Sequence, residues 1–328
     1  MKIFWFDIKK PILALAPMAG YTDSAFRQIC KEFGADLVYS EMASVTALSY
    51  APEKTLAMLK FFKIERPYIV QLFGSEPEHF IKAVQIIENK LKPDGVDINF
   101  GCPVKKVQKQ GAGAVLMDKP KLAKEIIKAV INNTDLPVSI KVRSRVGQTD
   151  VLKFLNYVND LDIKAVMIHG RTMAQGFSGP VDWQIIKKAR DYFPGIILAN
   201  GGVKTAEDAI KLLEQTGSDG IGIARGALGR PWIFNEVKSI KLPPKDGSLS
   251  ACGMKPLAEK VKNSKEIFRV ALKHARLAEI LKGKDNLVEM RKHLCWYVQG
   301  LPGAREMRNK LVKVKSVKDI EIIFKYHS

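Results

Sequence analysis

Residues 68–101 read YIVQLFGSEPEHFIKAVQIIENKLKPDGVDINFG. An apolar run of strand length, 68–74, is followed by an amphipathic helical segment and then by a second apolar run, 95–101. Such runs are typical of parallel strands buried on both faces, and a helix is the usual connection between two of them. The stretch therefore predicts one strand–helix–strand unit.

The same unit recurs along the first 230 residues. Further apolar runs rich in Val and Ile, which bring the expected strands to eight, lie at 12–18, 36–42, 137–143, 165–171, 195–201 and 219–225. Eight β/α units fit a TIM (β/α)8 barrel, which takes about 250 residues. An open doubly wound sheet is the alternative, but the first run ends APMAGYTD, without the GxGxxG turn of that fold.

The pattern changes after residue 241. A break rich in Pro, Gly and Ser, LPPKDGSLS (242–250), precedes apolar residues at helical spacing from Leu257 to Ala275 and from Leu287 to Val298. We expect a barrel domain over 1–241, a linker over 242–254 and a small all-α helical domain over 255–328. Further helices are expected after Pro302.

The charge of the chain is strongly positive. It has 53 Lys and Arg against 34 Asp and Glu, and residues 241–328 alone hold 20 basic and 9 acidic residues. Such an excess favours a polyanionic partner, with nucleic acid the first candidate. A basic protein without such a partner is the plainer alternative.

The cysteines and the apolar runs indicate the compartment. The four cysteines, Cys30, Cys102, Cys252 and Cys295, form no CxxC and no metal-ligand pattern. No run approaches the roughly 18 apolar residues of a membrane span, and charges interrupt the N-terminal run, unlike a signal peptide. We expect reduced thiols, a cytoplasmic protein, and neither a metal nor a membrane partner.

Polar side chains sit near the ends of five expected strands. Alternation places them on one face of each strand; they are Gln71, Asp97, Asn99, Ser139, Lys141, Arg143, His169, Arg171 and Asn200. A single one would be read as a hydrogen-bonded scaffold group. Because unpaired buried polar groups are costly, a ring of them at the barrel mouth indicates a polar ligand.

Glycines follow the seventh and eighth runs. ANGGV (199–203) precedes a helix expected from Thr205, and IARGALGRP (223–231) places Arg225 among glycines. These loops are the usual phosphate site of a TIM barrel, and an arginine adds a cationic fork. A phosphate-bearing cofactor or substrate is expected.

These residues resemble the tRNA-dihydrouridine synthases, most closely the bacterial B type. The resemblance runs in family order through LAPMAGYTD, QLFGSEP, DINFGCPVKKV, KVR, IHGRT, ANGGV, ARGALGRPWIF and RKHLCWYVQGLPGA. It implies an FMN-binding barrel with a helical tRNA-binding domain, and an NADPH-dependent reduction of uridine to dihydrouridine. Flavin N5 would give a hydride to C6 of uracil, and a protonated group would supply the proton to C5.

The resemblance also implies residue roles. Cys102 matches the catalytic acid, which accounts for a thiol at a turn, and its ordinary pKa near 8.5 leaves it protonated at pH 7. The FMN contacts would be Pro17, Met18, Ala19, Gln71, Lys141, His169, Asn200, Gly201, Gly202, Ala224 and Arg225. Asn99 and Arg171 match positions near flavin and substrate.

Two groups of basic residues could hold RNA phosphates. One is Lys105, Lys106 and Lys109 in the cysteine loop, for which a solvated loop is the alternative. The other is a stripe on one face of an expected helix near 258–281, with no acidic partner among its members: Lys262, Lys265, Arg269, Lys273 and Arg276. A solvated charged face is the alternative there.

The sequence departs from the family pattern at two places. Arg145 and Val146 stand where many members have Gly and Trp, and Gly202 stands where B-type members often have an acidic residue. Two other functions are the alternatives: an FMN barrel oxidoreductase of a small molecule, of the dihydroorotate dehydrogenase kind, and a non-enzymatic RNA-binding barrel. A monomer is favoured.

Overall fold

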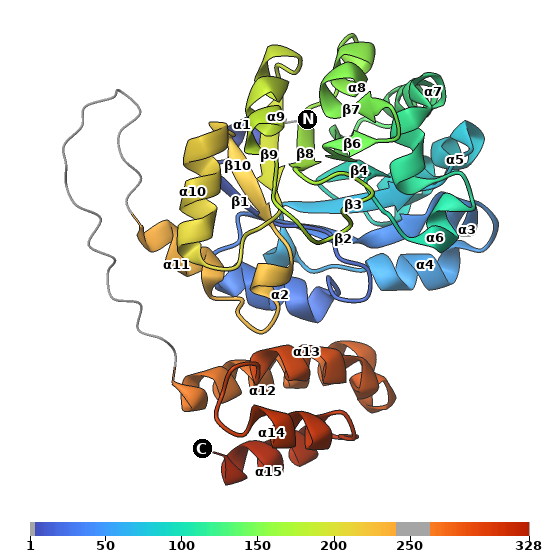
Figure 1. The fold of residues 1–328 in the computed structure, drawn as a ribbon. Coiled ribbons are helices and arrows are strands. Elements are labelled where there is room, and N and C mark those ends of the chain that lie inside the picture. The colour runs from blue at the N-terminus through green and yellow to red at the C-terminus, as the bar shows by residue number, and fades with distance from the viewer. Residues whose placement is uncertain (1–3, 241–262, 328) are drawn as a thin grey trace, which may run out of the picture.

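Eight parallel strands close into a barrel in the computed structural model, which describes residues 4–240 and 263–327 (Figure 1). The strands are β1 (Ile12–Leu15), β2 (Leu37–Ser44), β3 (Tyr68–Phe73), β4 (Gly95–Phe100), β5 (Val138–Arg143), β8 (Ala165–His169), β9 (Ile196–Asn200) and β10 (Gly220–Ile223). The barrel closes where β1 pairs with β10, with Ile12 opposite Gly220. The predicted TIM barrel is confirmed, and the open sheet is wrong.

Helices surround the barrel (Figure 1). They are α2 (Ser24–Glu32), α3 (Val45–Tyr50), α4 (Pro52–Leu59), α5 (Pro77–Lys90), α6 (Lys105–Gln108), α7 (Pro120–Ile131), α8 (Val151–Val158), α9 (Trp183–Lys188), α10 (Ala206–Thr216) and α11 (Ile233–Ser239). Local signals set their ends: Pro77 opens α5, and Thr205 caps α10 through the N–H of Asp208. Gly217, with a φ of 60°, ends α10 in the left-handed conformation.

Alternate residues of the strands fill the barrel interior. Apolar side chains form its floor, together with Trp5 of α1 (Phe4–Asp7): Ile12, Ala14, Leu37, Tyr39, Ile69, Ala165, Met167, Ile196 and Leu198. Gln71, Lys141 and Asn200 also point into the barrel, but they lie nearer the C-terminal ends of their strands than the apolar floor does. The alternation predicted from the sequence therefore places the polar side chains on the inner face, toward the C-terminal ends of the strands.

A short antiparallel hairpin, β6 (Arg145–Val146) with β7 (Thr149–Asp150), follows β5. The sequence did not predict it. It carries the first departure from the family pattern: Val146 is buried, whereas Arg145 is exposed.

The helical lobe, residues 263–327, lies beside the barrel (Figure 1). It comprises α12 (Ser264–Lys282), the 3-10 segment η5 (Lys284–Glu289), α13 (Met290–Tyr297), α14 (Ala304–Leu311) and α15 (Val317–Tyr326). The predicted helices, including those after Pro302, are present. The predicted linker 242–254, and residues Leu257, Val261 and Lys262 of the first predicted helix, lie outside the described residues.

The lobe packs on α2 of the barrel. Ala25 and Ile29 of α2 share one apolar core with α12 and α13. Asp23, which caps α2, accepts a hydrogen bond from Lys282 Nζ at 2.7 Å. Beside this ion pair the buried His274 stacks on Phe26, with ring centroids 5.5 Å apart. Apolar packing and a part-buried ion pair thus fix the lobe against the barrel.

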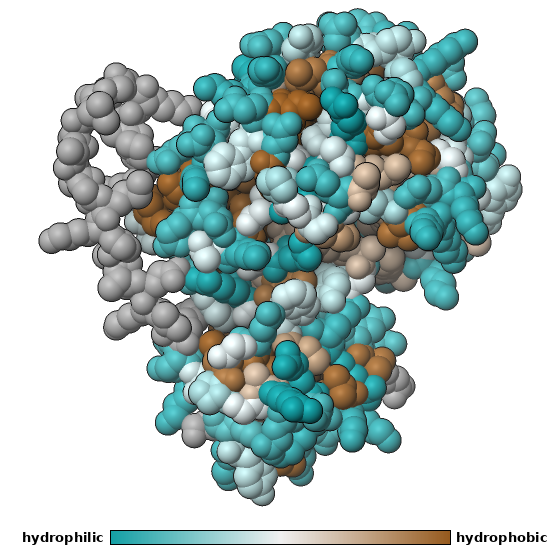
Figure 2. Space-filling view, in the orientation of Figure 1, coloured by the Kyte–Doolittle hydropathy of each residue, from teal (hydrophilic) through white to brown (hydrophobic). Residues whose placement is uncertain are grey.

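Figure 2 shows mainly hydrophilic residues over the visible face of both parts, with separate apolar patches. Within 4–240 and 263–327, no helix combines the length and apolarity needed to cross a membrane.

Candidate active site

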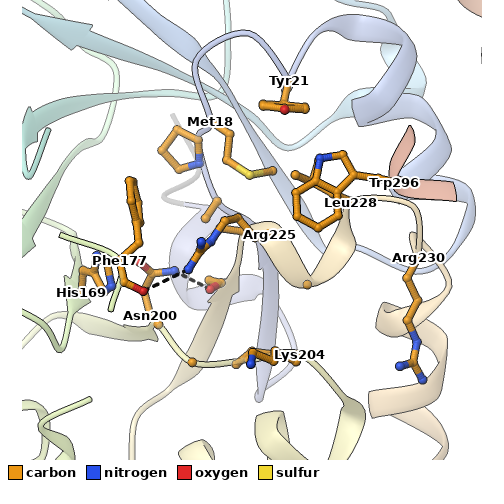
Figure 3. Close-up of a pocket in the computed structure, with 18 of the residues that line it drawn as sticks. Met18, Tyr21, His169, Phe177, Asn200, Lys204, Arg225, Leu228, Arg230 and Trp296 are labelled. Carbon is orange, nitrogen blue, oxygen red and sulfur yellow. Dashed lines mark hydrogen bonds between the residues drawn. The ribbon is translucent and has the colours of Figure 1, made fainter. Parts of the chain in front are cut away.

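A cavity of about 1550 Å³ opens at the C-terminal ends of the strands. Most of the predicted site residues line it: Pro17, Met18, Ala19, Gln71, Asn99, Cys102, Lys141, His169, Arg171, Asn200, Gly201, Gly202, Ala224 and Arg225. In Figure 3, Met18, Tyr21 and Trp296 lie on one side of Arg225, and His169 and Phe177 lie on the other. The structure therefore brings together residues that span more than 200 positions of the sequence.

Cys102 lies half-buried in the loop that leaves β4. The loop turns because Asn99 Oδ1 accepts hydrogen bonds from the N–H groups of Gly101, at 3.0 Å, and Cys102, at 2.9 Å. Burial raises the pKa of the Cys102 thiol above its ordinary value, which outweighs the lowering by a backbone hydrogen bond and by Lys141. The thiol is therefore protonated at neutral pH and can act as a proton donor.

Several of the polar side chains on the inner face satisfy one another. Asn99 Nδ2 donates to Gln71 Oε1 at 2.8 Å, and Gln71 Nε2 donates to Asp97 Oδ2 at 2.8 Å. Asp97 is fully buried, and burial raises its pKa to about 6, although hydrogen bonds from Gln71 and Ser139 act in the opposite direction. The ring of polar groups is thus partly a network of its own and partly open to a ligand.

Cations dominate the middle of the cavity. Lys141 Nζ donates to Asn200 Oδ1 at 3.3 Å, and burial, followed by the charge of Arg143, lowers the pKa of Lys141 to about 8. Burial and then the charge of Lys141 lower the pKa of His169 to about 2. His169 is consequently a neutral imidazole at neutral pH, and the surrounding cations favour an anionic ligand.

The ends of β9 and β10 are shaped by glycine. Gly201 and Gly202 have φ values of 112° and 82°, in the region that favours glycine. A Cβ at Gly201 would lie 2.8 Å from His169 Cδ2, so a side chain there would clash with the His169 ring. Gly202, the second departure from the family pattern, thus lies in a backbone conformation that favours glycine.

Arg225 lies at the edge of this glycine region. Its guanidinium is 4.9 Å from the ring centroid of Phe177 and donates to the Phe177 carbonyl at 3.2 Å. The guanidinium is exposed and points toward Phe177 in Figure 3, and Lys204 lines the same cavity. Two cations and a glycine turn give the donor set that a phosphate group requires.

The cavity also includes residues that the sequence argument did not assign to it. From the barrel these are Tyr21, Met42, Phe177 and Lys204, and from the helical lobe Ile267, Trp296, Tyr297, Gln299 and Leu301. Trp296 and Leu301 belong to the motif RKHLCWYVQGLPGA, whose resemblance to the family could have predicted that they lie near the site. Phe177 lies in an irregular loop, where no periodicity marks a residue in advance.

Arg143 was placed on the inner face but was given no role. It is buried, and its Nε donates to Gly101 O at 2.8 Å while its NH1 donates to Gly176 O at 2.7 Å. It therefore ties the cysteine loop to the loop that carries Phe177.

The predicted RNA contacts lie outside the cavity. Lys105 and Lys106 are exposed on α6, close in sequence to Cys102. Lys265, Arg269 and Lys273 are exposed on α12. Among the described residues, no group of His, Cys, Asp and Glu has the arrangement to hold a metal ion.

The expectation that the α12 stripe has no acidic partner is wrong for two of its members. Lys273 Nζ lies 2.6 Å from Glu32 of α2, and Arg276 lies 2.6 Å from Glu321 of α15. Sequence spacing along one helix could not reveal these partners because both come from other helices. Lys265 and Arg269 remain as cations for which no acidic partner is found in the described part of the chain.

Comparison with known sequences identifies the family of this chain. The sequence model of the dihydrouridine synthase (Dus) family matches residues 14–326. The chain belongs to the dihydrouridine synthase family. It is 33% identical over 311 residues to the probable tRNA-dihydrouridine synthase 1 of Synechocystis sp., covering 93% of this chain and 82% of that protein. It is 35% identical to the tRNA-dihydrouridine synthase B of Pseudomonas aeruginosa, covering 90% and 86% of the two chains.

Solved structures agree with the fold of this dihydrouridine synthase. A 2-naphthoyl-CoA reductase bound to 2-naphthoyl-CoA has a TM-score of 0.54 at 14% identity, covering 69% of this chain and 50% of that chain. The resemblance to the bacterial B type is confirmed by the Pseudomonas relative. The small-molecule oxidoreductase and the non-enzymatic RNA-binding barrel are both disfavoured by the family match.

Proposed function

We propose that this dihydrouridine synthase reduces specific uridines of tRNA to dihydrouridine, with FMN as its bound cofactor and NADPH as the reductant. One observation carries the proposal: a protonated thiol, Cys102, lines the same cavity as a cationic phosphate region at Arg225. A proton donor and an anion-binding site in one cavity are what a flavin-dependent reduction of a uracil ring requires.

The residues of the cavity fit FMN. Gly201, Gly202, Ala224 and Arg225 would hold its phosphate, because the glycines leave space and the guanidinium supplies charge. Pro17, Met18 and Ala19 would pack against the ring. Asn200 would orient Lys141, while Gln71, Lys141 and the neutral His169 would face its polar edge.

FMN, when bound, supplies the hydride for C6 of uracil. Cys102 holds the proton for C5, and burial keeps that proton on Sγ at neutral pH. Asn99 fixes the backbone of Cys102, and Asn99 and Arg171 would contact the flipped uridine. A base must leave its stack to reach a buried site, and residues of the helical lobe line this cavity together with those of the barrel.

The RNA backbone would lie along basic residues of both parts. Lys105 and Lys106 stand beside the cysteine loop, and Lys265 and Arg269 stand on α12. Lys273 would contribute less, because Glu32 already neutralises it. We further propose a cytoplasmic monomer with a barrel domain at 1–241, a linker at 242–254 and a tRNA-binding domain at 255–328.

Cofactor identity and substrate are tested separately. The purified protein should be yellow, and the cofactor released by heat should migrate as FMN on chromatography. FAD, or no flavin after reconstitution, would contradict the cofactor. Anaerobically reduced enzyme should then be reoxidised by unmodified tRNA and not by uridine or orotate. Faster reoxidation by orotate would favour the small-molecule reductase instead.

Mapping dihydrouridine in tRNA from a strain that lacks the gene would identify the positions modified. Loss of dihydrouridine at one or a few positions is expected. An unchanged map, in a strain without a second enzyme of this family, would contradict the proposed substrate.

A further inference from the structure

Asp97 is a buried carboxylate to which the proposed reaction gives no role. It is fully buried on the inner face of β4, below the cavity, and it is not among the residues that line it. Within the described residues no Lys or Arg forms an ion pair with it. Its partners are two neutral groups: Gln71 Nε2 at 2.8 Å and Ser139 Oγ at 2.7 Å. An unpaired buried charge is costly, so its presence calls for an explanation.

The hydrogen bonds that begin at Asp97 lead in one direction to Cys102. Gln71 donates to Asp97, and Gln71 Oε1 then accepts from Asn99 Nδ2 at 2.8 Å. Asn99 Oδ1 in turn accepts the N–H of Cys102 at 2.9 Å and that of Gly101 at 3.0 Å. Three side chains on two adjacent strands thus connect a buried charge with the backbone of the predicted acid.

The direction of this chain of hydrogen bonds follows from the carboxylate of Asp97. An ionised carboxylate only accepts hydrogen bonds, so Gln71 must turn its NH2 toward Asp97 and its carbonyl toward Asn99. Asn99 must then turn its own NH2 toward Gln71, which leaves its carbonyl for the N–H groups of the cysteine loop. With the amides reversed, the NH2 of Asn99 would face two backbone donors.

We propose that Asp97 is a positioning residue: by fixing the orientation of the Gln71 and Asn99 amides, it holds the Cys102 loop in place for proton transfer. Only the effect on turnover rests on the proposed function. The effect on the loop is a property of the free protein and is measured without RNA.

Two variants and their combination test the direction of the chain. Asp97→Asn lets either end of an amide face Gln71, so both orientations of the chain become accessible. Asn99→Asp places an acceptor against Gln71 Oε1, so Gln71 must turn away and face Asp97 with its carbonyl. The double variant Asp97→Asn/Asn99→Asp reverses the donor–acceptor direction of all these side-chain hydrogen bonds. The carboxylate introduced at position 99 can still accept the N–H of Cys102. Ser139→Ala is the control, because it removes a hydrogen bond of Asp97 outside the path to Cys102.

Peptide-resolved hydrogen exchange of the segment containing Gly101 and Cys102 is the first measurement. Asp97→Asn should exchange about 3- to 10-fold faster there, as expected for the loss of one hydrogen bond. Asn99→Asp, whose carboxylate still accepts the N–H of Cys102, should instead lose the hydrogen bond between Gln71 and Asp97 and lower the melting temperature. The double variant should return close to wild type. Ser139→Ala should lower the melting temperature without this local change.

Turnover is the second measurement. Asp97→Asn should lower kcat for tRNA about 10- to 100-fold, as misplacement of a reacting group does, with an unchanged KM. The proposal is overturned if Asp97→Asn exchanges like wild type, or if Ser139→Ala accelerates exchange in the segment as much as Asp97→Asn does. It is also overturned if the double variant exchanges faster in this segment than Asp97→Asn does. If wild type fails to act on tRNA, the exchange results still decide the role of Asp97.

Discussion

At the scale of single residues, the protonated state of Cys102 separates the two halves of the proposed reaction. Cys102→Ala should leave reduction of the flavin by NADPH near the wild-type rate, because that step needs no proton from the thiol. The reduced flavin should persist when tRNA is added, with turnover about 10²–10⁴-fold lower, the usual contribution of a general acid. Anaerobic stopped-flow absorbance measures both steps.

Cys295→Ala is the matched control, since Cys295 is a half-buried cysteine of α13 that does not line the cavity. It should behave as wild type. Normal tRNA turnover by Cys102→Ala would make Cys102 a structural residue.

Arg225 should govern retention of the cofactor. Its exposed guanidinium packs against the ring of Phe177 at the proposed phosphate site. Arg225→Ala should weaken FMN binding about tenfold or more, because charge-assisted hydrogen bonds are stronger than neutral ones. Titration of the apoprotein with FMN, followed by flavin fluorescence, gives the Kd. Arg145→Ala, which removes an exposed arginine outside the cavity, should leave the Kd unchanged.

Alternation along strands was enough to predict which polar residues lie on the inner face of the barrel, but not that Asp97 and Ser139 lie below the cavity. Gln71, Asn99 and Lys141 were placed correctly because side chains of a strand alternate strictly between two faces. Partners were not predictable, since Gln71 and Asp97 come from different strands whose register is set only by the closed barrel. The polar ring was taken as evidence for a ligand alone, whereas some of its members satisfy each other.

At the scale of elements, strands were easier to predict than short segments. The eight apolar runs coincide with the barrel strands because burial on both faces requires continuous apolar sequence. The β6–β7 hairpin gave no such signal, since its strands have two residues each. Asp118 holds it from outside by accepting from Thr149 Oγ1 at 2.9 Å. An element stabilised by a distant side chain has no local pattern.

The α12 stripe gives a prediction at this scale. Lys265→Gln/Arg269→Gln should weaken tRNA binding and flatten the log–log salt dependence by about 1.5, because each phosphate contact contributes roughly 0.7–0.9. Filter binding between low and moderate salt measures the slope. FMN content should not change.

Lys187→Gln/Lys188→Gln removes the same charge from exposed positions on α9, at the far side of the barrel from the lobe (Figure 1). That control should keep the wild-type slope. Equal slopes for wild type and the α12 variant would show that the stripe is a solvated face that does not contact tRNA.

At the scale of the whole molecule, the docking of the lobe on α2 should depend on pH. His274 faces Asp23 of the barrel, Lys282 of its own helix, and His293 and Tyr297 of α13. Burial lowers its pKa from 6.5 to about 4, although Asp23 acts in the opposite direction. A base with a lowered pKa in the folded state contributes stability that is complete above pH 6.5 and is lost toward pH 4.

The expected loss is about 3 kcal/mol for this change in pKa. His274→Leu should flatten the dependence of the unfolding free energy on pH between 4 and 6.5. Urea unfolding at a series of pH values measures it. Parallel curves for the two proteins would show that His274 does not titrate on unfolding. Asp97 contributes equally to the pH dependence of wild type and of His274→Leu, so it does not affect the difference between the two curves.

Residues of both the barrel and the helical lobe line the cavity, which has a consequence for the order in which it forms on the ribosome. Domains generally fold as they emerge, N-terminal parts first. All eight strands are complete once β10 has been made, whereas Trp296 and Leu301 are translated more than 70 residues later. The nascent barrel can therefore assemble its glycine and arginine region while one side of the chamber is still open to water. Completion of the chamber is left to the helical lobe, so a ribosome-bound chain would acquire the proposed cofactor site before it acquires an enclosed place for RNA.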